Sequence, residues 1–397
     1  MRFWRALILV CLLAVTVVPA AQAEEVDSTA KSFWLHMNST PTTDEMITAE
    51  ASRRSYVVLN AWEADLAAKL KAANPKIQTF VYKDLSSTRS YACSNGVDDA
   101  DLPTGVGYCE ASNNHSEWFL QDPNGQRFEY DGYEGHWQMD VGNTDYQNAW
   151  ADDVIASSKA FDGVFMDNAL FACDTYHEGV CPSKYPTDES MRDAYRAMLA
   201  NTRQKFVDAN LKTIANLSNA RLYDGAWDSY VEHLDGGFDE WWLTFGDNDL
   251  LSEYEQGWGR QVAEIAANEA KGKITLVQPH HSGADQPFRY AYASYLLAAG
   301  SHAAISEIQE TDRYGNASEW RPEYDWNLGA PLGEHHEVAP NVHERDFECG
   351  TVIVNANRTG SAAVTVRLAT TQLNEKGASV RAVSLKGTTG TILRKPC

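Results

Sequence analysis

The chain is poor in positive charge and, after its first residues, in long apolar segments. Its 33 lysines and arginines face 55 aspartates and glutamates, which gives a formal net charge of −22. A surface this acidic repels nucleic acid and anionic lipid, which argues against nucleic-acid binding. No apolar run beyond the N-terminus reaches the roughly 18 residues that a transmembrane helix requires. We therefore expect no membrane span in the mature chain. We also expect the protein to be a monomer.

Several short motifs are also absent. No C-x-x-C pair is present, which argues against a zinc site. No glycine-rich turn follows the first expected strand, which argues against an open, doubly wound nucleotide-binding sheet. The adjacent histidines His280 and His281 would point to opposite sides of a strand, so they do not form a metal pair. We expect neither a metal nor a cofactor.

Residues 1–23 have the pattern of a signal peptide. Two arginines precede a short apolar stretch, and an A-x-A cleavage site ends at Ala23. A membrane anchor is the alternative, but the apolar stretch is short and is followed by small residues and then acids. We predict export to the cell envelope or the medium, with Glu24 as the new N-terminus.

Six cysteines remain after the signal peptide. An even number of cysteines in an exported chain predicts disulfides. Pairing of nearest neighbours is preferred, and other connectivities stay open. The preferred pairs are Cys93–Cys109, Cys173–Cys181 and Cys349–Cys397.

Short β-rich runs alternate with helical patterns along residues 24–345, as in parallel α/β folds. Eight such strands with helices between them predict a (β/α)8 TIM barrel. The expected strands are 32–38, 56–63, 77–84, 161–168, 213–219, 233–242, 273–281 and 302–307.

Two parts of the chain depart from this alternation. Residues 85–135 form an insertion after the third strand, with an expected β-hairpin that turns at Pro123-Asn124-Gly125. Such an insertion would lie over the C-terminal face of the barrel, where it could line a substrate cleft. Residues 346–397 consist of short alternating runs and predict a small antiparallel β-domain. The aperiodic segment 311–345 is expected to wrap the barrel and link the two parts.

The C-terminal ends of the strands are rich in carboxylates, amides and aromatic rings. In a TIM barrel these ends face the active site. Acids and amides bind sugar hydroxyls, and aromatic rings present apolar faces on which sugar rings stack. The residues expected to bind substrate are Trp62, Glu63, Tyr82, Lys83, Asp84, Asn216, Asp239, Trp241, Gln278, His280 and Glu307.

Two of the strand ends offer a pair of catalytic acids. Glycoside hydrolysis requires two carboxyl groups on either side of the bond that is cleaved. Asp167 ends the fourth strand and Glu240 the sixth, which is close enough around a barrel for the pair to meet. Asp239 adjoins Glu240, and because neighbours in a strand point to opposite sides, only one can face the cleft. We favour Glu240.

These assignments compete with structural ones. Asp167 could instead be the N-cap of the next helix or a turn residue. The rings of Trp62 and Trp241 could pack in the core or in a lid instead of binding sugar. Lys83 could form a structural ion pair.

Five segments together resemble the hypothetical glycosyl hydrolase family 15. They are FDGVFMDN, MDVGNTDYQNAWADDV, EWFLQDPNGQ, EYDWNLGAPLG and RDFECGTVIVNAN. More distantly, the chain is similar to the endo-α-1,4-polygalactosaminidase type of barrel, and the similarity covers most of residues 31–395. The resemblance implies a catalytic barrel with Asp167 ending strand four, Glu240 ending strand six and a companion C-terminal β-domain. It supplies no substrate, although an aspartate on strand four is typical of barrels that cleave α-linkages.

The sequence thus predicts a secreted glycoside hydrolase that acts on a poly- or oligosaccharide, with an α-linked substrate favoured. Two other functions stay open. A non-catalytic carbohydrate-binding barrel would keep the aromatic and amide side chains without two carboxylates at catalytic separation. A metal-dependent polysaccharide deacetylase would need a cluster of histidine and aspartate ligands, which the sequence does not offer.

Overall fold

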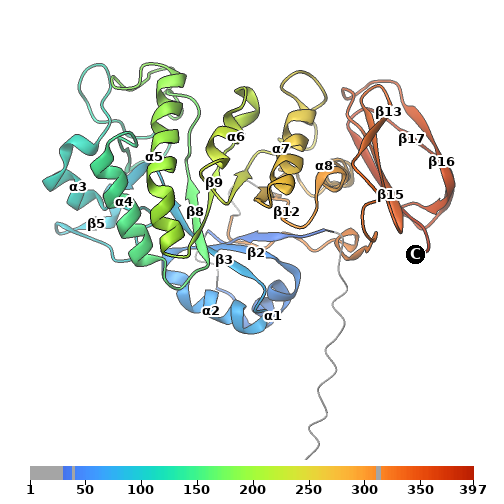
Figure 1. Cartoon of the computed structure of the whole chain (residues 1–397), viewed down its shortest axis with the longest axis horizontal. Helices are drawn as coiled ribbons and strands as arrows, with labels where there is room; N and C mark the ends of the chain where they lie inside the picture. Colours follow the sequence, from blue (N-terminus) through green and yellow to red (C-terminus); the bar gives the residue numbers. More distant parts are fainter. Residues whose placement is uncertain (1–29, 38–40, 310–313) are drawn as a thin grey trace, which may run out of the picture.

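Eight parallel strands form a single sheet in the computed structural model, which describes residues 30–37, 41–309 and 314–397 (Figure 1). A parallel bridge between Ser32 and Ile305 joins the last strand to the first and closes the barrel. The predicted TIM barrel is confirmed, whereas the expected signal peptide lies outside the described residues. The strands, in sheet order, are β1 (Phe33–Leu35), β2 (Tyr56–Leu59), β3 (Gln78–Asp84), β8 (Gly163–Asp167), β9 (Lys212–Asn216), β10 (Gly236–Asp239), β11 (Ile274–Val277) and β12 (Ala303–Ile305).

Every expected strand overlaps one of these, but most observed strands are shorter. The polar ends of the expected runs leave the sheet and form the loops that border the C-terminal face. Residues after β2, for example, turn into the short helix η1 (Ala61–Glu63), and β10 ends at Asp239, so residues 240–242 of the expected strand lie outside the sheet.

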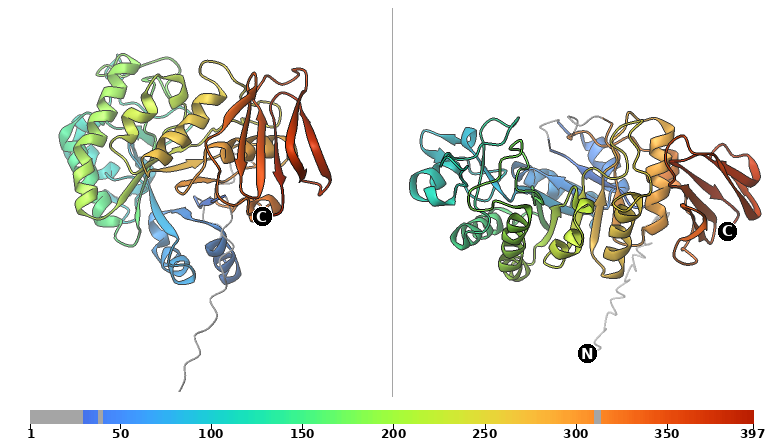
Figure 2. Two further views of the ribbon diagram at one scale, coloured as in Figure 1. Left: turned by 45° about the vertical axis from the view of Figure 1, so that its right-hand side comes forward. Right: turned by 90° about the horizontal axis from the view of Figure 1, so that it is seen from above.

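Helices lie between successive strands and cover the outside of the barrel (Figure 2). Their starts follow local capping rules: Thr187 accepts a hydrogen bond from Ser190 N, and Asn143 accepts one from Asp145 N. No α-helix follows β12 in the described chain, which continues through η5 (Pro322–Asp325). The helices between strands are α1 (Asp44–Arg53), α2 (Ala64–Ala73), α4 (Thr144–Ser157), α5 (Asp188–Asp208), α6 (Ala226–Val231), α7 (Trp258–Ala270) and α8 (Asp285–Ala298).

The barrel strands alternate between two apolar clusters. Phe165 and Phe238 belong to the cluster that fills the barrel interior, whereas Val164 and Met166 belong to the one beneath the helices. This is the expected two-residue period of a strand. Asp167 continues the phase of Phe165, and Glu240 continues that of Phe238, so both side chains point toward the barrel axis at its C-terminal end.

The insertion between β3 and α4 lies at the opposite side of the barrel from the C-terminal sheet (Figures 1 and 2). β4 and β7 pair antiparallel, and the expected turn forms with Asp122 N donating to Gln126 O at 2.8 Å. Gly125 has φ +80°, a left-handed conformation that glycine adopts readily. The elements of the insertion are β4 (Ser87–Arg89), η2 (Ser90–Ala92), β5 (Cys93–Ser94), β6 (Val97–Asp98), α3 (Tyr108–Asn114), η3 (Ser116–Trp118) and β7 (His136–Gln138).

The C-terminal residues form a separate six-stranded antiparallel sheet, as predicted. It packs on α8, and a Cβ at Gly390 would lie 2.6 Å from Cβ of Ala293, so only glycine allows this approach. The sheet already begins at His336, ahead of residue 346. Its strands, in chain order, are β13 (His336–Ala339), β14 (Val342–Phe347), β15 (Gly350–Asn355), β16 (Val364–Leu373), β17 (Ser379–Leu385) and β18 (Thr389–Arg394).

Three disulfides join the cysteines in the preferred order. They are Cys93–Cys109 in the insertion, Cys173–Cys181 after β8 and Cys349–Cys397 in the C-terminal sheet. The nearest-neighbour pairing is therefore confirmed. Among the described residues, no helix is both long and apolar enough to span a bilayer.

Candidate active site

A cavity of about 850 Å³ opens at the C-terminal ends of the barrel strands. Phe165 and Phe238 form its floor, and five residues predicted from strand ends line it. These are Tyr82, Asp167, Asn216, Glu240 and Trp241. The next helix after Asp167 begins at Asp188 and is capped by Thr187, so Asp167 is not the helix cap that the sequence left open.

The two candidate acids lie side by side and share one hydrogen-bond donor. Asn216 Nδ2 is 3.0 Å from Oδ1 of Asp167 and 2.8 Å from Oε2 of Glu240. The two carboxyl oxygens are therefore at most about 5.8 Å apart, since these two distances meet at one nitrogen. Two carboxyl groups at this spacing can act on opposite ends of one bond.

Each acid also receives a hydrogen bond from a tyrosine. The Tyr82 hydroxyl donates to Oδ2 of Asp167 at 2.5 Å, and the Tyr314 hydroxyl donates to Oε1 of Glu240 at 2.5 Å. Together with Asn216, these donors fix the orientation of both carboxyl groups. Such charge-assisted hydrogen bonds are stronger than neutral ones.

The electrostatic environment favours the protonated form of Asp167. Burial, with the negative charges of Asp84 and Glu240, raises the pKa of the Asp167 carboxyl to about 6. The two neighbouring carboxyl groups can thus hold one proton between them in mildly acidic solution. Cleavage requires that proton on the group that protonates the glycosidic oxygen, while the other group is ionised.

A polar network lies behind Asp167. Asp84 Oδ2 accepts hydrogen bonds from Arg89 Nη2 at 2.8 Å and from Asn168 Nδ2 at 2.7 Å. Asn168 has φ +59°, a left-handed conformation that asparagine tolerates better than most residues. Asp84 is fully buried and bonded, so it supports the cavity wall and does not line the cavity as expected of a substrate ligand.

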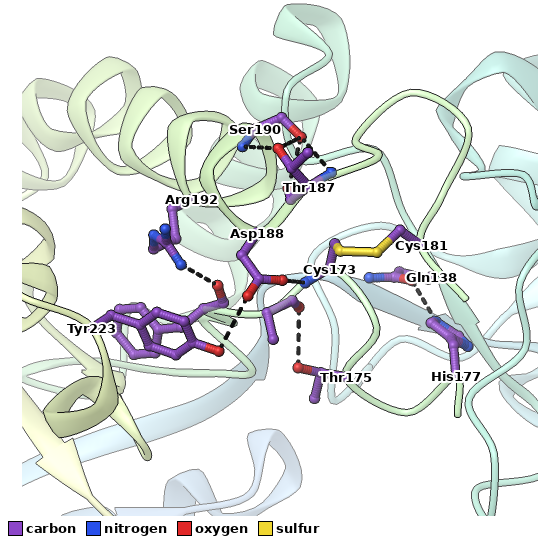
Figure 3. Close-up of a disulfide and its surroundings, with 12 residues drawn as sticks. Gln138, Cys173, Thr175, His177, Cys181, Thr187, Asp188, Ser190, Arg192 and Tyr223 are labelled. Carbon is purple, nitrogen blue, oxygen red and sulfur yellow. Dashed lines mark hydrogen bonds between the residues drawn. A yellow bond between two sulfur atoms is a disulfide. The ribbon is translucent and has the colours of Figure 1, made fainter. Parts of the chain in front are cut away.

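The loop between β8 and α5 brings a third tyrosine to the cavity. Tyr176 lines the cavity and donates a hydrogen bond of 3.0 Å to Oδ1 of Asn168. Figure 3 shows the disulfide that ties this loop, with Asp188 on one side and the His177–Gln138 pair on the other. Asp188 accepts from Cys173 N at 3.0 Å, so the loop is anchored at its base.

His280, which was predicted to bind substrate, does not line the cavity but contacts two residues that do. Its ring stacks on Trp241 at 3.7 Å, and its Nε2 is 2.7 Å from the backbone oxygen of Glu240. Burial lowers the pKa of His280 to about 4, so the ring is neutral near pH 7 and donates one hydrogen bond. It positions the segment that carries Glu240 and Trp241.

Other residues predicted to bind substrate lie outside the cavity, because they occupy the outward phase of their strands. Asp239 accepts a hydrogen bond from Gln261 Nε2 of α7 at 2.6 Å, and burial raises its pKa to about 7. Lys83 donates to Leu102 O at 2.6 Å, and burial lowers its pKa to about 8. Of the two adjacent acids, the cavity thus contains Glu240 and not Asp239.

Three more residues predicted to bind substrate do not line this cavity. They are Glu307, Gln278 and Glu63. Glu307 forms a buried ion pair with Arg321 at 2.6 Å, and Gln278 is buried outside the cavity lining. Glu63 lies 2.8 Å from His36 and belongs to the turn that presents Trp62. Trp62 itself lines a second cavity beside the first.

Several lining residues were not expected from the sequence. Arg89 and Tyr133 come from the insertion, which was expected to line a cleft, and His136 follows its expected end at residue 135. The sequence pattern singles out none of the three. Tyr314 belongs to the aperiodic segment 311–345 and carries no local signal. Besides Phe165 and Phe238 in the floor, the other unexpected lining residues are Leu35, Met37, Tyr130, Asn168 and Tyr176.

One group of potential metal ligands occurs within residues 30–37, 41–309 and 314–397. It consists of Cys93, Asp98 and Cys109. The two cysteines form a disulfide, so they offer no thiolate ligands.

Comparisons with solved structures give remote similarities. The glycoside hydrolase domain of PelA from Pseudomonas aeruginosa is 14% identical, with 74% of this chain and 98% of that domain covered and a TM-score of 0.46. Ega3 from Aspergillus fumigatus, in complex with galactosamine, is 10% identical over 72% and 94% of the two chains, with a TM-score of 0.41. An alpha-amylase from Geobacillus thermoleovorans, complexed with acarbose, is 10% identical over 95% and 100%, with a TM-score of 0.49. Similarities of this size carry no information on activity.

The family comparison is more specific. No curated protein sequence gives a significant match. The model of the hypothetical glycosyl hydrolase family 15 matches residues 71–351, which is more than half of the 397 residues. The chain therefore belongs to the hypothetical glycosyl hydrolase family 15 and is a glycoside hydrolase.

Proposed function

We propose that this glycoside hydrolase cleaves a poly- or oligosaccharide through Asp167 and Glu240, with retention of anomeric configuration. The observation that carries the proposal is the single amide nitrogen of Asn216 that bonds both carboxyl groups. Retaining enzymes place their carboxyl groups about 5 to 5.5 Å apart, whereas inverting enzymes leave about 6.5 to 9.5 Å for a water molecule. The upper limit of about 5.8 Å between the nearest oxygens supports the retaining arrangement.

In the first step, a carboxylate oxygen of Asp167 attacks the anomeric carbon and forms a glycosyl ester. Glu240 transfers its proton to the glycosidic oxygen as the bond from that oxygen to the anomeric carbon breaks. In the second step, Glu240 removes a proton from water, which attacks the same carbon and releases Asp167 as a carboxylate. The charge and the protons balance over the two steps.

The assignment of roles follows from the reach of the two side chains. Asp167 is the last residue of β8, and Tyr82 and Asn216 hold its short side chain at the floor of the cavity. Glu240 follows the end of β10 and has one more methylene group, so it extends further toward the leaving group. A fixed nucleophile below the sugar ring and a longer acid beside it match the needs of the two steps.

The substrate class follows from the chemistry of the cavity. Tyrosine and tryptophan rings with few amide and carboxyl groups suit sugar rings and their hydroxyls. An α-linked chain is favoured, because an aspartate at the end of strand four, here Asp167, is typical of barrels that cleave α-linkages. A panel of starch, dextran, chitosan, an α-1,4-linked galactosamine polymer and polygalacturonate tests both the sugar and the linkage.

We also propose that the enzyme acts outside the cytoplasm. Three disulfides are typical of an oxidising compartment, and the first 23 residues have the pattern of a signal peptide. Mass spectrometry of the expressed protein in the culture medium should find a mature N-terminus at Glu24.

The test of the mechanism compares Asp167→Asn and Glu240→Gln with Glu232→Gln, which changes an exposed glutamate away from the cavity. Release of reducing ends from the panel should fall by about 1,000-fold or more in the first two variants and stay unchanged in the third. Full activity of Asp167→Asn would exclude Asp167 from the reaction.

Azide distinguishes the two roles. With a substrate that has an activated leaving group, Glu240→Gln should regain activity in azide and yield a glycosyl azide of retained configuration. A substitution at the nucleophile should instead give the inverted azide. Assignment of the product anomer by NMR reports the stereochemistry directly, and an inverted product from the wild-type enzyme would overturn retention.

A further inference from the structure

A second cavity of about 520 Å³ adjoins the catalytic cavity. The two cavities have four lining residues in common, so they form one continuous cleft. These residues are Met37, Tyr82, Arg89 and His136. The second cavity lies between the turn after β2 and the insertion after β3.

Exposed aromatic rings gather along this cleft. Trp62 and Tyr91 line the second cavity with 50% and 63% of their surface exposed, and Tyr133 lines the first with 50% exposed. Within the described chain, Tyr254 at 43% is the remaining aromatic residue among the exposed large apolar side chains. Exposed large aromatic side chains that cluster in one place mark a binding surface.

The chain segments that carry the two rings of the second cavity are held by neighbouring contacts. Trp62 belongs to η1, where Glu63 accepts a hydrogen bond from Asn60 N at 2.9 Å and pairs with His36 at 2.8 Å. Because its neighbours are fixed, Trp62 can be exposed without a flexible loop beneath it. A ring on a fixed segment loses less conformational entropy when a ligand binds than a ring on a mobile loop does.

Tyr91 lies in a part of the insertion that a disulfide and an ion pair hold in place. The Cys93–Cys109 disulfide lies two residues beyond it, and the Arg89–Asp84 ion pair at 2.8 Å lies two residues before it. The Tyr91 hydroxyl is 3.4 Å from Nε2 of His136, a residue that both cavities have in common. The aromatic surface thus continues from Tyr91 toward the catalytic cavity.

Polar groups surround the rings of the second cavity. Asn60, Asp99 and Asp101 line it, and the two aspartates are exposed. Carboxylate and amide oxygens accept hydrogen bonds from sugar hydroxyls. The same aspartates repel uronate or sulfate groups on a polymer.

We propose that the second cavity is a distal subsite that binds further sugar rings of the same chain, with Trp62 and Tyr91 as stacking platforms. The inference rests on the proposed function of the first cavity and adds that the enzyme selects chains over short glycosides. The preferred ligand is a neutral or amino-sugar chain and not a polyuronate. A chain that fills both cavities extends well beyond the cleaved bond, which favours cleavage within long chains.

The test uses Trp62→Ala and Tyr91→Ala in the full chain, with Trp62→Phe as the conservative variant and Tyr254→Ala as the matched control. The probes are the panel polysaccharide that the wild-type enzyme cleaves and the 4-nitrophenyl glycoside of its sugar, which fills only the catalytic cavity. For the polysaccharide, kcat/KM should fall by about tenfold in each alanine variant, the size of one aromatic contact. For the nitrophenyl glycoside, kcat/KM of both alanine variants should stay within about twofold of the wild-type value. Trp62→Phe and Tyr254→Ala should stay within about twofold on both probes.

The outcomes separate this proposal from that of the active site. Equal losses on both probes, or no loss on either, overturn the distal subsite and leave the roles of Asp167 and Glu240 intact. Full activity of Asp167→Asn overturns the proposed mechanism without affecting the chain-length result. Affinity electrophoresis through gels that contain each polymer adds a second readout: retardation by polygalacturonate alone, or by none of the five polymers, overturns the subsite.

Discussion

The Tyr314 hydroxyl donates a hydrogen bond of 2.5 Å to Oε1 of Glu240, although 74 residues separate them in the chain. The backbone oxygen of Tyr314 also accepts a hydrogen bond from Met37 N at 2.9 Å, which ties the tyrosine to the end of β1. Glu240 is thus held on one side by Asn216 and on the other by a residue that follows the last barrel strand. The position of the candidate acid depends on parts of the chain that meet only in the folded protein.

Tyr314→Phe should lower kcat by about 10- to 100-fold with little change in KM. A hydrogen bond to a charged group contributes about 1.5 to 3 kcal/mol, and its loss leaves Glu240 free to rotate. Steady-state kinetics on the cleaved polysaccharide measure the effect. Tyr133→Phe is the matched control, because it keeps an exposed ring of the same cavity, and its kcat should not change. An unchanged kcat in Tyr314→Phe would mean that this contact does not position the acid.

The activity should fall on the acidic side of about pH 6. Burial, Asp84 and Glu240 raise the pKa of Asp167 to about 6, and a nucleophile must be ionised to attack. Protonation below that pH therefore removes the reactive form. A plot of kcat/KM against pH should show this acidic limb, and a limb near pH 4, the ordinary range of a carboxyl group, would contradict it.

Asp84→Asn should move the same limb to lower pH. The negative charge of Asp84 is one of the groups that raise the pKa of Asp167, and its removal also leaves the Arg89 guanidinium unpaired beside the site. Both changes favour ionised Asp167. Circular dichroism confirms that the variant is folded, and a limb that stays in place would exclude this electrostatic coupling.

The barrel could be predicted from the sequence because its signals are local. A two-residue period of apolar side chains marks each strand, and the polar residue that ends it identifies the C-terminal face. This identified Asp167, Asn216 and Glu240. The same period distinguishes Glu240 from Asp239, since only one phase continues the barrel interior.

The residues that were wrongly expected to bind substrate were also chosen because they lie at strand ends. Lys83 and Glu307 end strands, but proximity to a strand end does not say on which side a side chain lies, and both face outward into polar pairs. Tyr314 and Tyr176 reach the cavity on loops. Their placement depends on contacts with distant residues, which no periodic pattern records.

Removal of the Cys173–Cys181 disulfide should impair catalysis more than it lowers the stability of the whole protein. The loop that it closes carries Tyr176, whose hydroxyl bonds Asn168 at the cavity wall. The double variant with serine at both positions should lose about 2 kcal/mol in free energy of unfolding, the entropy of a short closed loop. It should also lose kcat/KM and become sensitive to proteolysis within residues 169–187.

The Cys349–Cys397 disulfide provides the control for that experiment. It lies in the C-terminal sheet, across the barrel from the insertion, and neither cysteine lines the cavity. Serine at both positions should lower the melting temperature and leave kcat/KM unchanged. Equal losses of activity in the two double variants would mean that global stability, and not the loop, controls the site.

Glu264→Gln should make the enzyme more stable above neutral pH. Glu264 of α7 and Asp239 are both buried; burial raises the pKa of Asp239 to about 7, and burial together with the negative charge of Asp239 raises that of Glu264 well above its ordinary value. The folded protein therefore binds a proton that the unfolded chain, with carboxyl pKa values near 4, releases. Stability from this pair is present below about pH 4 and is lost as the pH rises through 7.

In the variant, a neutral amide replaces one of the two acids and can donate a hydrogen bond to ionised Asp239. Urea unfolding of the disulfide-intact protein at pH 5 and pH 8 measures the difference. The wild type should lose on the order of 2 kcal/mol between these pH values, whereas Glu264→Gln should lose much less. Glu232→Gln, at an exposed position, should behave like the wild type. The same pH dependence in Glu264→Gln as in the wild type would show that Asp239 and Glu264 do not share a proton.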